Sequence, residues 1–231
     1  MSNKKAEEVE QGMKEYLSKK YNEEFEFVKK PYLYGNEGSV PIYQAKAIPV
    51  GRPEYEFFVE GDRLNSGPYI DGYLQAKWTY QGKQEVDKKI REVYGVDTNF
   101  FLRYTFEYND DKFKDLNHSE VLSKCDGKAY INICIDFFCD KFDKSVEAEK
   151  AYQILKAYVL DNKIDMYNLT ILYFDKGFRQ QYDANGNFEG NKTFDQLNEE
   201  GVLINYLKVY DFGEHSREVN RSSDVIKYYK Y

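Results

Sequence analysis

FFLRYTFEY (residues 100–108) and AYINICIDFF (residues 129–138) alternate strictly between two faces. In the first segment one face carries Leu and aromatic residues, while Arg103, Thr105 and Glu107 share the other. A period of two residues is typical of an antiparallel strand that lies half in a core and half in water. We therefore expect two adjacent or near-adjacent strands. The core positions of the second strand are then Ile131, Ile133, Ile135 and Phe137.

Helical and strand patterns flank these segments on both sides. Apolar residues at helical spacing predict helices over residues 6–21, over 69–94, and from about 143 to 159. Gly82 lies inside the second helix, at a position where a helix can bend or split. Further strands are expected at 24–28, 42–48, 55–59, 168–175 and 204–212, short helices near 119–125 and 193–200, and an Asn-Gly hairpin at 182–188. The chain is therefore predicted to be α+β, with antiparallel sheets and three main helices packed on them.

The order helix, turn and strand recurs at residues 12–28, 86–106 and 152–174. This recurrence indicates two related modules built from a helix and a meander, at residues 1–95 and 96–231. The alternative is one continuous α+β domain in which such pairs recur by chance.

The composition narrows the class of partner. Hydrophobic residues make up 42% of the chain and charged residues 32%, as in a folded globular protein. The net charge of −7 repels polyanions, so we expect no nucleic-acid partner and favour a basic protein. The sequence has no apolar run of about 18 residues, so we expect no membrane span. The start, MSNKKAEEVEQ, lacks a signal-peptide pattern and predicts a cytoplasmic protein; an extracellular or membrane-anchored location is the alternative if a signal segment was removed.

The sequence offers little to a metal ion or cofactor. His118 and His215 are the only histidines, both lie in polar segments, and we expect them at the surface. DANGNFEG (residues 183–190) spaces oxygen side chains as a calcium loop does, but a tight hairpin explains it equally and is preferred. Phosphate-binding glycine motifs are missing. We therefore expect no metal and no cofactor.

The three cysteines are expected to be free thiols. Their number is odd, and Cys134 and Cys139 have opposite parity near one strand, so they should point to opposite faces. Reduced thiols agree with a cytoplasmic location.

Carboxylates are plentiful, and one of them stands within a predicted strand. Asp136 shares a strand face with Asn132 and Cys134, and the alternation predicts that this face is wet. If the face were covered, Asp136 would be a buried acid that needs a partner.

Four aromatic residues gather near the predicted start of the helix over 69–94: Tyr69, Tyr73, Trp78 and Tyr80. Trp and Tyr supply large contact areas, so this cluster is our candidate interaction surface. The alternative is that these residues form the seam where the helix packs on a sheet. We assign no catalytic, cofactor-binding or metal-binding residue.

The stretch AKAIPVGRPEYEFFVEG, followed by IDGYLQAKWTYQGKQEVDKKIREVYG, resembles a module of uncharacterised α+β proteins from low-GC Gram-positive bacteria. The resemblance is loose and covers about residues 6–95. It implies an N-terminal helix, an antiparallel meander and a second helix. Many members resemble small surface lipoproteins, but this chain has no lipobox cysteine near its N-terminus. The resemblance assigns no catalytic residues.

The chain has 23 Tyr, an excess that indicates a contact surface. The alternative is that these tyrosines face the second side of thin sheets. Our leading hypothesis is a non-enzymatic protein-binding module with an acidic, tyrosine-bearing face; immunity or antitoxin-type inhibitors are one instance. A surface or secreted lipoprotein-type binding module and a carboxylate-based hydrolase are the alternatives. A neighbouring toxin gene would favour the immunity-type binding module, and an upstream signal segment would favour the lipoprotein-type module. A deep cleft with two perturbed carboxylates would favour the hydrolase.

Overall fold

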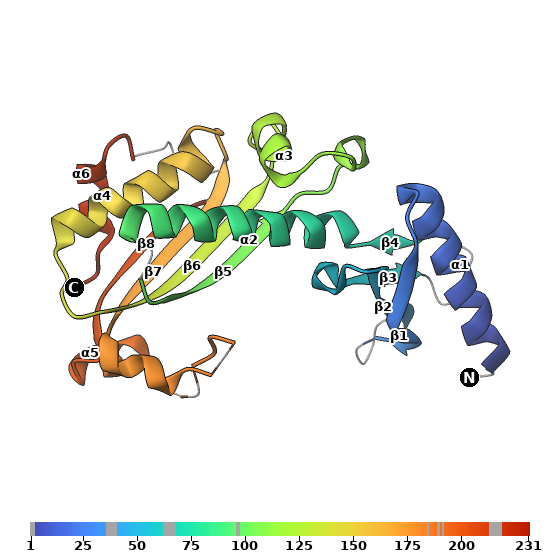
Figure 1. Ribbon diagram of the computed structural model, residues 1–231, viewed down its shortest axis with the longest axis horizontal. Coiled ribbons are helices and arrows are strands. Elements are labelled where there is room, and N and C mark those ends of the chain that lie inside the picture. The colour runs from blue at the N-terminus through green and yellow to red at the C-terminus, as the bar shows by residue number, and fades with distance from the viewer. Residues whose placement is uncertain are drawn as a thin grey trace. The chain divides into compact units, whose positions relative to one another are not determined.

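A computed structural model describes residues 3–35, 41–61, 68–95, 98–183, 185–188, 190, 192–212 and 219–231 (Figure 1). The described chain forms two compact units. The first comprises Met1–Tyr80 with Asn109–Asp115, and the second comprises Gln81–Tyr108 with Leu116–Tyr231. Helix α2 (Tyr73–Tyr94) contributes residues to both.

The first unit is an antiparallel meander with a helix packed on it. Its elements are α1 (Asn3–Tyr21), β1 (Phe25–Tyr34), β2 (Ile42–Pro49), η1 (Pro53–Tyr55), β3 (Phe57–Gly61), β4 (Ile70–Asp71), the start of α2, and η2 (Asp111–Phe113). The strands lie in the order β1-β2-β3-β4, so each strand pairs with the next one in sequence.

The core of the first unit is built from helical spacing and aromatic rings. In α1 every fourth residue from Val9 to Tyr21 is buried, which gives the helix one apolar face. Tyr73, in the first turn of α2, contacts the rings of Tyr21, Phe25 and Phe57 at centroid distances of 4.7, 5.2 and 5.4 Å. These edge and tilted contacts fix α1 and the start of α2 on the same sheet.

The second unit has a mixed sheet. Its elements are the rest of α2, β5 (Phe100–Glu107), α3 (His118–Lys124), β6 (Tyr130–Cys139), α4 (Lys144–Leu155), the π-helical turn η3 (Lys156–Leu160), β7 (Met166–Asp175), η4 (Lys176–Gln181), α5 (Phe194–Glu199), β8 (Leu203–Phe212), α6 (Ser222–Val225) and η5 (Ile226–Tyr228). Helices α2 and α4 lie across one face of this sheet (Figure 1).

The strand order β5-β6-β7-β8 confirms the prediction of an α+β chain and adds one parallel pair to it. The chain is α+β, β5 and β6 pair as antiparallel neighbours, and the predicted core residues of β6, from Ile131 to Phe137, are buried. The first sheet is antiparallel as expected, and the second is mixed because β6 and β7 are parallel. The physical reason is the helical crossover through α4 and η3, which returns the chain to the end of the sheet where β6 began.

Helix α2 runs through Gly82 as one continuous helix, so the glycine does not split it. A glycine is needed at this position because neighbouring side chains approach the helix backbone closely. A Cβ atom there would come within 2.4 Å of the Tyr104 ring and 2.7 Å of the His118 ring. Glycine therefore lets the helix lie directly against β5 and α3.

A second, smaller core covers the other face of this sheet near the end of β6 and β7. It joins Phe138, Leu172, Phe174, Leu197 and Leu203. Because the segment from η4 to α5 covers this face, Asp136 is buried, and the prediction of a wet carboxylate is wrong. Its partner is Arg103 on the neighbouring strand.

Within the described ranges, no helix is long and apolar enough to cross a membrane.

Candidate functional site

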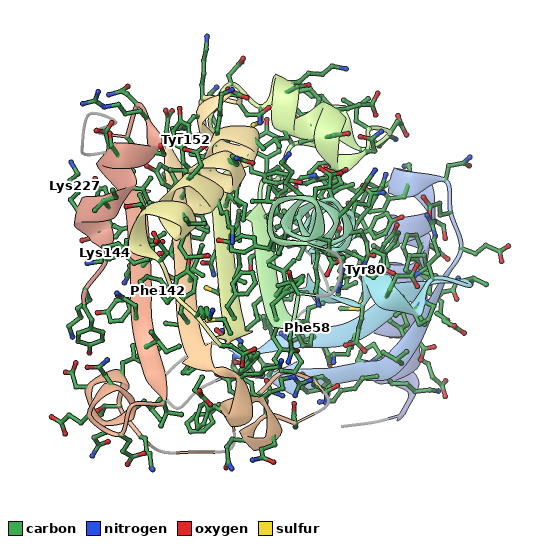
Figure 2. The ribbon with its side chains drawn as sticks, turned by 60° about the vertical axis from the view of Figure 1, so that its left-hand side comes forward. Phe58, Tyr80, Phe142, Lys144, Tyr152 and Lys227 are labelled. Atoms are coloured by element: carbon green, nitrogen blue, oxygen red, sulfur yellow. The ribbon has the colours of Figure 1, made fainter. Side chains whose placement is uncertain are left out.

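The structure separates the four aromatic residues of the candidate interaction surface. Tyr73 and Trp78 are fully buried. Tyr80, labelled in Figure 2, is partly exposed. Its ring meets the Tyr55 ring edge-on at a centroid distance of 5.5 Å. Tyr69 lines an open polar pocket of about 460 Å³ in the first unit. We take this pocket as the candidate functional site because it combines tyrosine rings with carboxylates.

The pocket gathers residues that are far apart in sequence. Helix α1 supplies two of its lining residues, the entry to α2 supplies three, and the segment Asn109–Asp115 supplies the rest. The lining residues are Tyr16, Lys20, Tyr69, Ile70, Asp71, Asn109, Asp110 and Asp111. The lining therefore combines three carboxylates with the Lys20 ammonium, and the Lys112 ammonium pairs with Asp110 at 2.8 Å.

Asp71 is the centre of the site. Its carboxylate is fully buried and accepts hydrogen bonds from the hydroxyls of Tyr16 and Tyr21, each at 2.7 Å, and from the Lys20 ammonium at 3.0 Å. It also accepts the Tyr73 backbone N–H in the first turn of α2, at 3.1 Å. A carboxylate at a helix N-terminus is stabilised by the free N–H groups and the helix dipole. Asp71 thus joins α1 to α2.

Tyr69 reaches the pocket through a slot between two glycines. A Cβ atom on Gly12 of α1 would lie 2.4 Å from the Tyr69 hydroxyl, and one on Gly61 of β3 would lie 2.8 Å from its ring. Any larger residue at either position would displace the ring. The ring meets Tyr16 at a centroid distance of 5.6 Å. The two phenols together form an aromatic wall.

The segment Asn109–Asp115 is held in the first unit by hydrogen bonds from lysine side chains to backbone carbonyls. The Lys114 ammonium donates to the Lys20 carbonyl at the end of α1, and the Lys77 ammonium donates to the Lys114 carbonyl, each at 2.9 Å. Asp110 caps η2 by accepting the Lys112 backbone N–H at 3.1 Å. The Asp111 carboxylate, 59% exposed, lies 2.9 Å from the Lys20 ammonium. Lys20 therefore bridges a buried and an exposed carboxylate.

We expect the Tyr16 phenol to ionise late. Burial, the hydrogen bond to Asp71 and the charge of that carboxylate raise the pKa of Tyr16 to about 12. A raised pKa in the folded protein means that the phenol's contribution to stability is complete below about pH 10, the unfolded value, and is lost as the pH rises through about 12. Phenolate absorbance of native and urea-unfolded protein measures the delay. The Asp71→Asn variant should move the Tyr16 step toward pH 10, and identical native and unfolded titrations would contradict the expectation.

His118 corrects the expectation of surface histidines. It is fully buried in the second unit, with Nδ1 at 2.7 Å from a Glu85 carboxylate oxygen and Nε2 at 2.7 Å from the Tyr104 hydroxyl. Its backbone N–H donates to the Gln81 side chain at 2.9 Å. This network ties α3 to α2 and β5, and we interpret it as structural because the ring is sealed from solvent. His215 lies outside the described residues.

The calcium-like loop is a hairpin in its described part. The Asp183 carboxylate accepts the backbone N–H groups of Asn185 and Asn187, each at 2.8 Å, and Gly186 has a φ of 83°. Glu189 lies outside the described residues. In the part of the chain that the structure covers, no group of three His, Cys, Asp or Glu side chains could hold a metal ion. The three cysteines are free thiols, and Cys125 is buried.

The sequence did not single out most of this site. Asp71, Asp110 and Asp111 stand in the sequence as ordinary acids, and Tyr16 and Lys20 as positions of an amphipathic helix. The available signal was the i, i+4 spacing of Tyr16 and Lys20, which places them on one helix face. Their meeting with Asp71, 55 residues after Tyr16, is a tertiary contact that spacing does not encode.

Comparisons with known proteins give a remote likeness. No family model matches the chain, and no curated protein is similar to it. The crystal structure of a DUF5037 family protein from Ruminococcus gnavus ATCC 29149 is similar over 87% of this chain and 90% of that chain, with 13% identity and a TM-score of 0.45. The likeness is to a protein of unknown function and carries nothing about activity.

Proposed function

We propose that this chain is a non-enzymatic protein-binding module that receives a basic side chain of a partner protein in the pocket around Asp71. The single observation behind the proposal is the pocket's own cation. Lys20 bridges Asp71 and Asp111, and its charged form is favoured: although burial, the largest influence, opposes it, hydrogen bonds to Asp111 and to other neighbours raise the pKa of the ammonium. The Asp111 carboxylate is 59% exposed and remains open to a second cation, whereas the Asp110 carboxylate is 31% exposed and pairs with the Lys112 ammonium at 2.8 Å.

An exposed apolar residue beside the acids supports the same proposal. Ile70 is 65% exposed and lines the pocket next to the Tyr69 ring. The methylene stem of Lys or Arg packs on such surfaces while its charged end reaches a carboxylate. The tyrosine rings add cation–π attraction of about 0.5–1 kcal/mol at an exposed site. The site therefore matches an amphipathic, basic side chain better than a polar or purely apolar one.

The overall charge of −7 would speed the approach of a basic partner. Toxin-neutralising immunity proteins are one instance of this class, and a neighbouring toxin gene would identify that instance. Exposed ion pairs contribute only about 0.2–1 kcal/mol each, so the pocket selects the partner, and other contacts must supply most of the affinity.

The test uses three end-blocked tripeptides, Gly-Lys-Gly, Gly-Arg-Gly and Gly-norleucine-Gly, in NMR titrations of the ¹⁵N-labelled protein. We expect the two basic peptides to shift the amides around Ile70 and Asp111 with dissociation constants of about millimolar order. The norleucine peptide should shift them far less, and added salt should weaken the basic peptides. Equal shifts from all three peptides would refute the proposal.

A matched pair of variants locates the site. Asp110→Asn with Asp111→Asn keeps the cap of η2, because Asn also accepts the Lys112 N–H. This double variant should abolish the preference for basic peptides. Glu7→Gln with Glu8→Gln makes the same charge change on the exposed side of α1 and should preserve the preference. Loss of preference in both variants would mean that only net charge is sensed.

A further inference from the structure

A second pocket lies wholly in the second unit, on the sheet face that the segment from η4 to α5 partly covers. It measures about 360 Å³, within the size range of small-molecule sites. Its lining is mainly apolar and also includes the paired side chains of Arg103 and Asp136. The apolar lining residues are Leu172, Phe174, Phe188, Phe194 and Leu197.

The Arg103 guanidinium group has more hydrogen-bond donors than its partner Asp136 accepts. Its two terminal nitrogens each donate one hydrogen bond to Asp136 at 2.8 Å, in a bidentate pair. A guanidinium group has five N–H donors. The described residues supply no acceptor for the other three. Because the Arg103 side chain is 51% exposed while that of Asp136 is 3% exposed, the free donors face the open side of the pair.

Asp136 fixes the guanidinium for a ligand. A buried carboxylate on the neighbouring strand holds the planar fork in one orientation and removes most of the entropy that a free Arg would lose on binding. The lining also includes Lys192. The Lys192 ammonium lies 2.6 Å from Glu200, so Arg103 is the stronger candidate for direct contact.

We propose that this pocket binds a small organic acid with an aromatic or branched apolar body. The ligand carboxylate accepts hydrogen bonds from the outward N–H groups of Arg103, and its body packs on the rings of Phe188 and Phe194. An acid fits better than a neutral ligand because the free donors at the site are cationic. An apolar body fits better than a bare anion because most of the lining is hydrocarbon.

The test compares three probes by calorimetry and NMR: 3-phenylpropionate, its neutral amide 3-phenylpropionamide, and acetate. We expect the acid to bind at least ten-fold more tightly than the amide, and acetate to bind more weakly than both. In wild-type protein the acid, and not the amide, should shift the Arg103 side-chain N–H resonances. Equal affinity for acid and amide, or acetate binding as tightly as phenylpropionate, would overturn the proposal.

Variants separate the two parts of the site. Arg103→Met combined with Asp136→Leu replaces the ion pair by apolar side chains of similar volume, and such replacements often preserve stability. This double variant should bind acid and amide equally. Phe188→Ala should weaken both probes and keep their ratio. If the double variant retains the ten-fold preference for the acid, Arg103 does not bind the carboxylate and the proposal fails. The Arg103 resonances of wild-type protein decide the matter if the double variant does not fold.

Discussion

We expect the Arg103→Met variant to lose about 3–5 kcal/mol of unfolding free energy at neutral pH, the range seen when a buried ion pair loses one partner. The reason is the unequal burial of the pair. Removal of Arg103 leaves the Asp136 carboxylate in a covered site without its cation. Urea denaturation of wild type and variant measures the difference.

Two further variants test this reason. Asp136→Asn leaves a guanidinium that is half exposed and can be hydrated, so it should cost clearly less than Arg103→Met. The double change Arg103→Met with Asp136→Leu removes both charges together and should recover most of the loss. Equal losses in the two single variants would contradict the role of burial.

The alternation in residues 100–108 and 129–138 was sufficient to predict β5, β6 and their core-facing residues. This succeeded because parity assigns each strand residue to a face from local sequence alone. The alternation does not show whether another segment of the chain covers the second face of the sheet. The cover over Asp136 comes from the segment after β7, which is distant in sequence, and its placement depends on packing around Phe138 and Phe174.

The sequence did not predict the parallel pairing of β6 and β7 or the burial of His118, and both depend on contacts between distant segments. The parallel pairing of β6 and β7 depends on the crossover helix, although the order strand, helix, strand was visible in the sequence and should have suggested it. His118 follows a good helix cap, the Asn117–Glu120 capping box, in a polar segment. Its burial arises because α3 docks on the glycine position of α2, and one sequence does not show that docking.

The His118→Ala variant is expected to lose about 3–5 kcal/mol of unfolding free energy, from a cavity and from two lost hydrogen bonds. The ring is fully enclosed, and its removal leaves the buried Tyr104 hydroxyl without its partner. Burial, followed by the charge of Glu85, raises the pKa of that phenol well above its usual value, so it remains a neutral group that still needs a hydrogen bond. Urea denaturation gives the loss.

Glu85→Gln is the matched control for this prediction. The Glu85 side chain is 36% exposed, and Gln can still accept the Nδ1–H hydrogen bond, so the variant should lose less than about 1 kcal/mol. Gly82→Ala should lose more than the control, because its new methyl group would meet both rings of the Tyr104–His118 pair and the gain in helix propensity is only about 1 kcal/mol. Slow hydrogen exchange of the His118 Nδ1–H in wild type would report the sealed network directly. If His118→Ala and Glu85→Gln lose the same small amount, the histidine is not a structural tie between α2, α3 and β5, and its two close contacts would call for a functional explanation instead.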